Sequence, residues 1–116
     1  GMNVSFGHDC VQDPWYSLGT GNMLDVAFMG LHVCQMTGTA EIDACYDMVT
    51  WNGAKTLQVE DQYGIEIGKP ANLIALNAQD RYDALRCRAT VHYVISQGKL
   101  LARTEAPRTT WHCDRE

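Results

Sequence analysis

The residues of this sequence best suited to chemistry lie close together near its N-terminus, at positions 7–16. Residues 3–6 alternate polar and apolar side chains, which predicts a short strand, and a long loop is expected to follow it. Asp9 then stands where strand gives way to loop, the place from which α/β barrels present catalytic groups and metal ligands. A carboxylate there could bind a divalent metal or accept a proton, although an Asp after a strand more often caps a turn. Position alone leaves both roles open.

The histidines do not form a metal-binding motif of their own. They are isolated in sequence, with no His-x-His or His-x-x-Glu spacing: His8, His32, His92 and His112. Strand alternation points His8 to the face opposite Asp9, so we expect a structural role for it. A catalytic metal needs three or more protein ligands in a fixed geometry, and Asp9 supplies one. The sequence therefore predicts that this chain by itself does not hold a metal ion tightly.

Two helices are expected to follow the loop. Asn22 is a suitable N-cap for a helix over residues 23–37, and Gly38 is typical of the residue just past a helix end. Apolar residues surround most of this helix, which therefore needs cover on more than one side. Thr39 is expected to cap a second helix with apolar residues at helical spacing, and the Asn-Gly pair at 52–53 predicts its end.

The second half of the chain changes to the two-residue period of strands. The predicted elements are strands at 73–76, 91–96, 99–102 and 109–112 and a short helix at 80–88 capped by Asp80. Gln97 and Gly98 suit the two-residue turn of a hairpin. This order predicts an α+β fold, in which a strand-loop-helix unit of an α/β barrel precedes a small antiparallel sheet.

Composition excludes several kinds of partner. The chain has 116 residues, 46% of them hydrophobic, which is enough for one modest core. Its net charge of -5 gives no cationic surface for nucleic acid or anionic lipid. No uncharged apolar run reaches about 18 residues, so a membrane is not an expected partner. The five cysteines are odd in number and scattered, which predicts free thiols and a cytoplasmic protein.

Several stretches resemble the bacterial cytosine deaminases of the amidohydrolase superfamily. The sequence FGHD at 6–9, with DPWYSLG at 13–19, resembles the last barrel strand of these enzymes and the loop that follows it. The sequence MGLHVCQ at 29–35 is similar to their next helix. The sequence YGIEIGKPANL at 63–73 is similar to the glycine-rich signature that leads the chain into the small β-domain beside the barrel. The resemblance covers nearly the whole chain, about residues 3–110.

The resemblance implies an activity and roles for three residues. In that family the Asp that ends the last strand binds the catalytic Fe or Zn and helps to deprotonate the metal-bound water, a role Asp9 would inherit. Trp15 occupies the place of a tryptophan that walls the pyrimidine pocket. Cys10 stands where many relatives carry a second Asp facing the substrate, and a thiol cannot replace a carboxylate as an anionic acceptor. The implied reaction is hydrolytic deamination of cytosine or a related amino-heterocycle, a small-molecule pyrimidine in the parent enzyme.

The resemblance also implies an incomplete enzyme, because the family's His-x-His pair, further histidines and proton-shuttling Glu are absent from this sequence. We therefore expect a C-terminal fragment that forms one folded unit, with the last barrel strand, active-site loop and two helices at 1–62 and a β-rich segment of the composite small domain at 63–116. Alone it is expected to be inactive, not to retain Fe or Zn, and to form a homo-oligomer that buries its apolar helix. The alternatives are a noncatalytic interaction or oligomerisation module, or activity restored by a second chain.

Overall fold

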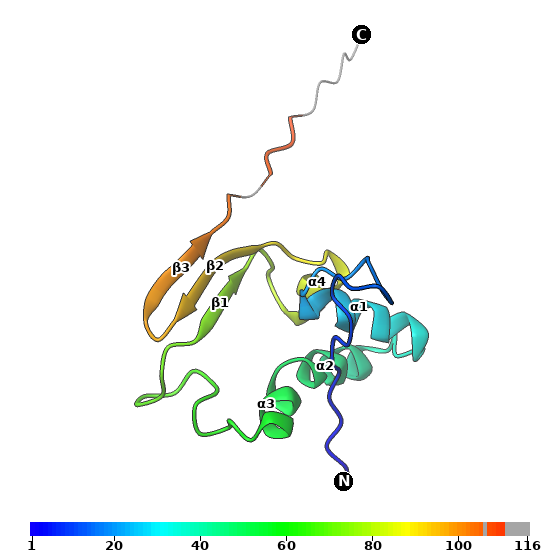
Figure 1. Cartoon of the computed structure of the whole chain (residues 1–116), viewed down its shortest axis with the longest axis horizontal. Coiled ribbons are helices and arrows are strands. Elements are labelled where there is room, and N and C mark those ends of the chain that lie inside the picture. The colour runs from blue at the N-terminus through cyan, green and yellow to red at the C-terminus, as the bar shows by residue number, and fades with distance from the viewer. Residues whose placement is uncertain (106, 111–116) are drawn as a thin grey trace.

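The described residues, 1–105 and 107–110 of this computed structural model, fold as four helices beside a three-stranded sheet (Figure 1). The elements in chain order are α1 (Met23–Val33), α2 (Thr39–Met48), α3 (Trp51–Leu57), β1 (Leu73–Leu76), α4 (Arg81–Arg86), β2 (Val91–Ser96) and β3 (Lys99–Arg103). This order confirms the predicted α+β fold. None of the described helices has the length and apolar content needed to cross a membrane.

Helix α1 begins where the sequence predicts but ends earlier. The Asn22 side chain accepts a hydrogen bond from the backbone N–H of Leu24 at 3.0 Å, which confirms it as the N-cap. The helix closes at Val33, and not at residue 37, because Gln35 takes the left-handed conformation with φ 55°. The N–H of Met36 then reaches back to the last turn, which satisfies a carbonyl that the ended helix leaves open.

Three expectations are wrong: Gly38 as the end of the first helix, Thr39 as the cap of the second, and the Asn-Gly pair at 52–53 as its stop. Gly38 does not end α1 but is the N-cap of α2, and its N–H donates to the Glu41 carboxylate at 2.7 Å. The break between α2 and α3 falls at residues 49–50, where the Thr50 hydroxyl donates to the Tyr46 carbonyl at 2.8 Å. Residues 52–53 therefore lie inside the first turn of α3.

Small side chains allow the helices to approach one another closely. Ala27 of α1 and Cys45 of α2 are fully buried, and the Cys45 thiol donates to the Ala27 carbonyl at 3.3 Å. Leu85 of α4 is 1% exposed and completes this core with Leu24 and other α1 residues. The second half of the chain thus contributes to the core of the first. The expected division between residues 62 and 63 stays a prediction.

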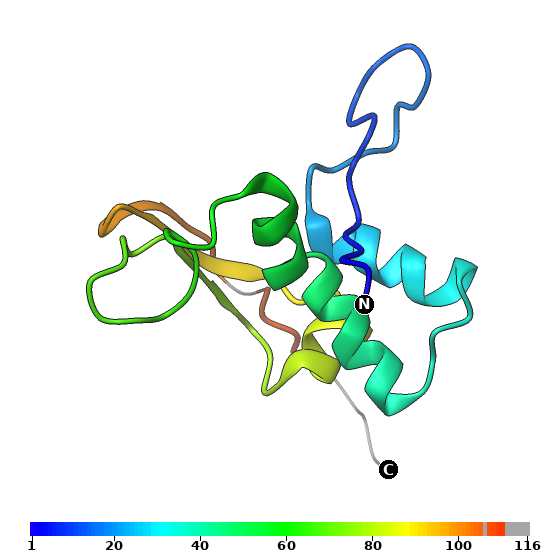
Figure 2. The same ribbon diagram turned by 90° about the horizontal axis from the view of Figure 1, so that it is seen from below.

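The sheet has the predicted hairpin. Its strands are antiparallel in the order β1-β2-β3, with Ile74 opposite Val94 and Val94 opposite Ala102. Gln97 and Gly98 join β2 to β3 with positive φ at both positions, as a type I′ turn requires. Large apolar side chains remain open to solvent on the sheet, and Figure 2 shows that the sheet extends away from the helices.

Two predicted strands are absent from the described residues. Residues 3–6 form an extended segment, called here the lead-in segment, without a neighbouring strand to pair with. A strand needs such a partner for its backbone hydrogen bonds, and helices α2 and α3 supply the contacts instead. Residues 109–110 also lack strand structure, while the rest of the strand predicted at 109–112 lies outside the described residues.

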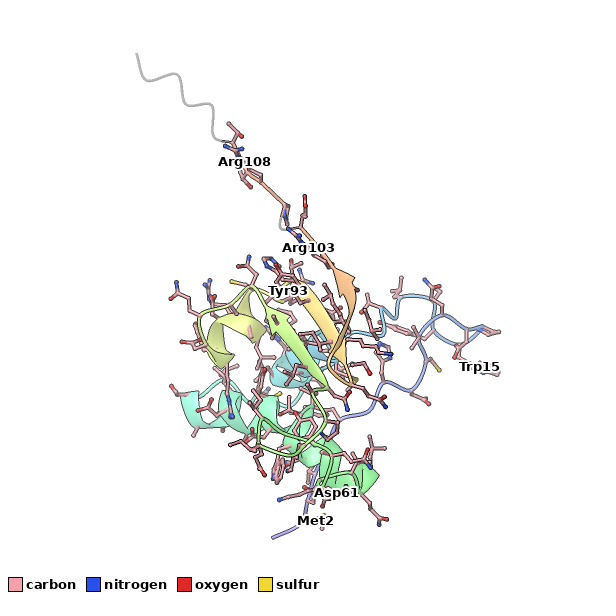
Figure 3. All side chains as sticks on the ribbon, turned by 90° about the vertical axis from the view of Figure 1, so that its left-hand side faces the viewer. Met2, Trp15, Asp61, Tyr93, Arg103 and Arg108 are labelled. Carbon is pink, nitrogen blue, oxygen red and sulfur yellow. The ribbon has the colours of Figure 1, made fainter. Side chains whose placement is uncertain are left out.

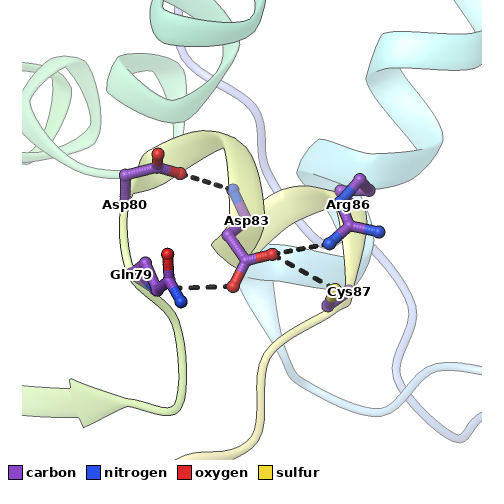
Figure 4. Close-up of polar contacts among 5 residues, drawn as sticks. All are labelled: Gln79, Asp80, Asp83, Arg86 and Cys87. Carbon is purple, nitrogen blue, oxygen red and sulfur yellow. Dashed lines mark hydrogen bonds and ion pairs between the residues drawn. The ribbon is translucent and has the colours of Figure 1, made fainter.

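Helix α4 is held at its start by two carboxylates (Figure 4). Asp80 caps it, as predicted, by accepting from the backbone N–H of Asp83 at 2.7 Å. The Asp83 carboxylate accepts from Arg86 at 2.8 Å, from the Cys87 thiol at 3.5 Å and from the Gln79 N–H at 3.4 Å. The Arg86 hydrogen bond, followed by that of Cys87, lowers the pKa of Asp83 from its ordinary value of 3.8.

We expect the stability that Asp83 provides to depend on pH. A lowered folded-state pKa gives stabilisation that is present above the ordinary value and lost as pH falls through the lowered one. Asp83→Asn should therefore reduce the urea midpoint at neutral pH, and its difference from wild type should shrink as the pH falls below the ordinary value of 3.8. The control is Asp61→Asn, a change at an exposed turn residue (Figure 3). A difference that stays constant with pH would contradict this account.

Candidate functional site

The lead-in segment is placed against α1 by the ring of Phe6. A Cβ on Gly30 would lie 2.6 Å from the Phe6 Cζ, so only glycine leaves room for this ring on the helix. The backbone N–H of Phe6 donates to the Met48 carbonyl at the end of α2 at 3.1 Å. These contacts fix the chain three residues before Asp9, where it leaves the helices and enters the loop.

The loop that follows is closed at its base by another glycine. Figure 2 shows residues 7–21 extending away from the helices and returning to α1. At the neck, Gly19 is buried against the outgoing chain, and a Cβ there would overlap the backbone of Val11 and lie 2.7 Å from the Cys10 carbonyl oxygen. The two sides of the loop therefore touch at Gly19, directly after the residues expected to carry chemistry.

The loop beyond the neck is organised by Asp13. Its Oδ1 accepts from the backbone N–H groups of Trp15 at 2.9 Å and Tyr16 at 3.0 Å, while its own N–H donates to the Tyr16 carbonyl at 3.2 Å. The Cys10 thiol lies near the same carboxylate, and each of the two groups shifts the pKa of the other. One carboxylate thus lies beside both Cys10 and the turn that bears Trp15.

The electrostatics of this group keep the thiol protonated and the carboxylate charged. The hydrogen bond to Asp13, followed by desolvation and the nearby charge of Asp9, raises the pKa of Cys10. The hydrogen bond from Cys10, followed by the Tyr16 N–H, lowers the pKa of Asp13. Cys10 is therefore a neutral hydrogen-bond donor at neutral pH, and it lacks the activated thiolate of a nucleophile.

The residues singled out from the sequence do not converge on one enclosed pocket. Asp9 is exposed and lies beside the half-buried Cys10. Trp15 is 88% exposed at the outer end of the loop, where Figure 3 shows it pointing away from the body of the protein. His8 instead lines a depression of about 530 Å³ between the loop and α1, with Phe6 and other largely apolar residues.

The described residues do not form a complete metal centre. No group of three or more His, Cys, Asp or Glu side chains comes together among residues 1–105 and 107–110. Asp9 offers one hard oxygen ligand, and Fe or Zn requires further ligands in a fixed geometry. A metal held through Asp9 would need the other ligands from outside these residues.

Comparison with known proteins identifies the family. A family model described as "Amidohydrolase family" matches residues 1–102 of the 116.

The chain belongs to the amidohydrolase family.

A curated amidohydrolase, the N-isopropylammelide isopropyl amidohydrolase of Pseudomonas sp. (strain ADP), is 30% identical over 105 residues, which are 90% of this chain and 26% of that protein. Two solved structures are of 5-methylcytosine deaminase from Klebsiella pneumoniae, and both are 42% identical to this chain. The one with 5-fluorocytosine has a TM-score of 0.89 over 95% of this chain and 27% of that chain. The one with phosphonocytosine has a TM-score of 0.87 over 94% and 27%.

These similarities confirm the resemblance drawn from the sequence. The chain spans about a quarter of the length of the amidohydrolases it matches. The roles expected for Asp9, Cys10 and Trp15 stay predictions. Sequence reasoning missed Asp13 as the residue that organises the loop, although the Asp-Pro pair it forms with Pro14 is a common signal for the start of a turn.

We expect Asp13 to hold the loop through its Oδ1 acceptor and not through its charge alone. In Asp13→Ala the N–H groups of Trp15 and Tyr16 lose their partner, and their amide exchange should accelerate by about fivefold, the worth of one side-chain hydrogen bond. Asp13→Asn keeps the acceptor and should exchange nearly as slowly as wild type. Gln12→Ala, at an exposed neighbour, is the control. Equal acceleration in the Asn and Ala variants would show that the charge, and not the acceptor, holds the turn.

Proposed function

We propose that this chain supplies one part of the active site of an amidohydrolase that hydrolyses the exocyclic amino group of a cytosine-type ring and releases ammonia. The observation that carries the proposal is the similarity to 5-methylcytosine deaminase, at 42% identity and a TM-score of 0.89. This similarity covers 95% of the chain. An unrelated use of the same fold would not be expected to keep this level of identity.

The substrate is proposed to be 5-methylcytosine or cytosine. Of the two proteins compared, 5-methylcytosine deaminase has the higher identity to this chain, and one of its structures was solved with 5-fluorocytosine. The N-isopropylammelide amidohydrolase is less similar, at 30% identity. Cys10 favours a substrate that needs no anionic hydrogen-bond acceptor from this position, because a thiol is a weak, neutral hydrogen-bonding group.

Within this active site we assign three roles. Asp9 is proposed to bind the Fe or Zn of the complete protein as one carboxylate ligand and to accept a proton during hydrolysis. Cys10 is proposed to face the substrate. Trp15 is proposed to wall the ring, and its 88% exposure leaves the indole available to a substrate or to further parts of the protein. The remaining metal ligands would have to come from beyond residues 1–105 and 107–110.

We expect this chain alone to release no ammonia from cytosine or 5-methylcytosine when Fe(II) or Zn(II) is added, because Asp9 is a single ligand. Activity should arise when a segment with the missing histidines and Glu is joined to the chain or co-produced with it. In that assembly Asp9→Asn should abolish turnover, while Gln12→Ala should leave it unchanged. Turnover by the chain alone that disappears in Asp9→Ala would overturn the first expectation. An assembly with its full ligand set but without turnover would overturn the proposed function.

The chain alone is also expected to self-associate. Met29 and Val33 of α1 are 59% and 73% exposed, and Leu100 and Leu101 of β3 are 58% and 66% exposed. β3 is an edge strand as well, and such an edge can pair with another copy.

Light scattering coupled to size exclusion at micromolar concentration should therefore give a mass at least twice that of the 12.9 kDa chain. Leu101→Lys should weaken the association, since it places a charge on the exposed strand. A monodisperse 12.9 kDa wild-type species would contradict the expectation.

A further inference from the structure

The lead-in segment is clamped by two polar residues of α3. We propose that Asn52 and Thr56 are positioning residues, which fix the register of residues 3–6 and so the place at which Asp9 is presented. The inference rests on the proposed function for the importance of Asp9, but the clamp itself is a feature of the described contacts. It assigns a role to a helix that carries none of the residues expected to meet the substrate.

Asn52 binds the lead-in segment through both its side chain and its backbone carbonyl. Its Nδ2 donates to the Val4 carbonyl at 2.8 Å, and its backbone carbonyl accepts from the Asn3 side chain at 3.1 Å. Together with the bond from the Phe6 N–H to the Met48 carbonyl at 3.1 Å, these contacts tie residues 3, 4 and 6 to the α2–α3 region. Each hydrogen bond involves a different residue of the segment, so a segment shifted along its own direction could not form the same hydrogen bonds.

Thr56 completes the clamp with a fully used hydroxyl. Its hydrogen is donated to the Asn52 carbonyl at 3.0 Å. A hydroxyl has one donor and two acceptor sites, so Thr56 accepts from the Ser5 hydroxyl at 2.8 Å and from the Asn3 Nδ2 at 3.1 Å. Thr56 therefore bonds two residues of the lead-in segment, Asn3 and Ser5, while it remains bonded to Asn52.

The clamp also occupies one edge of the extended chain. The polar backbone groups of alternate residues in a strand point to the same edge. The Val4 carbonyl and the Phe6 N–H therefore share an edge, and both find partners in α2 and α3. In this structure the two helices therefore set the register of the segment along this edge.

Register decides which side chain is presented. A slip of one residue reverses the two faces of an extended chain, which would put His8 where Asp9 now stands. A slip of two residues would move Asp9 by about 7 Å, at about 3.3 Å per residue. Either slip would remove the carboxylate from its place, even if the fold were otherwise intact.

The test uses the full chain labelled with ¹⁵N and follows the amide exchange of Phe6 and the amide shifts of residues 8–10. Thr56→Val removes the hydroxyl at nearly constant volume, while Thr56→Ser keeps it. Asn52→Asp keeps the shape of Asn52 but loses the donor to the Val4 carbonyl. Gly53→Ala is the matched control, because it lies in the same helix, has no atom within 4 Å of the added Cβ and should favour the helix.

Thr56→Val and Asn52→Asp are expected to accelerate exchange at Phe6 by about fivefold or more. Both should also shift the Asp9 amide signal, whereas Thr56→Ser and Gly53→Ala should resemble wild type. A role limited to helix stability would instead make Phe6 follow global unfolding in every variant.

The proposal is overturned if Phe6 and Asp9 do not respond to Thr56→Val and Asn52→Asp, or if Thr56→Ser disturbs them as much as Thr56→Val does. If Asn52→Asp fails to fold, the Thr56 pair decides between these results. Neither readout requires turnover. An inactive assembly would therefore count against the proposed function, while an unresponsive lead-in segment would count against the clamp.

Discussion

Close packing around small residues of α1 is the constraint on which the rest of this structure depends. Ala27 lets Cys45 of α2 approach within hydrogen-bonding distance of the α1 backbone. Gly30, on the same helix, leaves room for the ring of Phe6. α1 is thus the surface on which α2, α4 and the lead-in segment are assembled. A larger side chain at either small position would separate these parts, because interiors at native packing density have no space to absorb it.

Features governed by local rules could be predicted from the sequence. The caps at Asn22 and Asp80 are predictable because each side chain accepts a hydrogen bond from the backbone of its own helix. The turn at Gln97 and Gly98 is predictable because a two-residue hairpin turn with positive φ favours glycine. Where tertiary contacts decided, prediction failed. Helix α1 ends at a left-handed Gln35, a residue type that gives no sign of a helix end. Residues 52–53 stay helical, with Asn52 bonded to the lead-in segment.

The candidate site shows the same division. The place of Asp9 at the start of a long loop could be predicted from the sequence, and so could the family that the surrounding motifs resemble. The contacts between residues within the loop could not be predicted. The approach of Cys10 to Asp13 and of Gly19 to Val11 depends on how the loop folds back, and the periodicity of the sequence does not indicate that path. The lead-in segment was expected to be a strand because its residues favour one, but a strand is defined by a partner as much as by propensity.

The contact between Gly19 and the outgoing chain has a consequence for how this loop can change. Segments of six to about 16 residues whose ends touch and whose interior packs on itself are Ω-loops, and the stretch closed at Val11 and Gly19 has this form. Lengthening such a loop adds little entropic cost once its ends are joined. Insertions near its tip can therefore remodel what Trp15 contacts while the neck keeps Asp9 where it is. If Trp15 and Asp9 have the roles proposed for them, this loop separates substrate recognition at its tip from chemistry at its base, so a change of specificity at the tip need not rebuild the base.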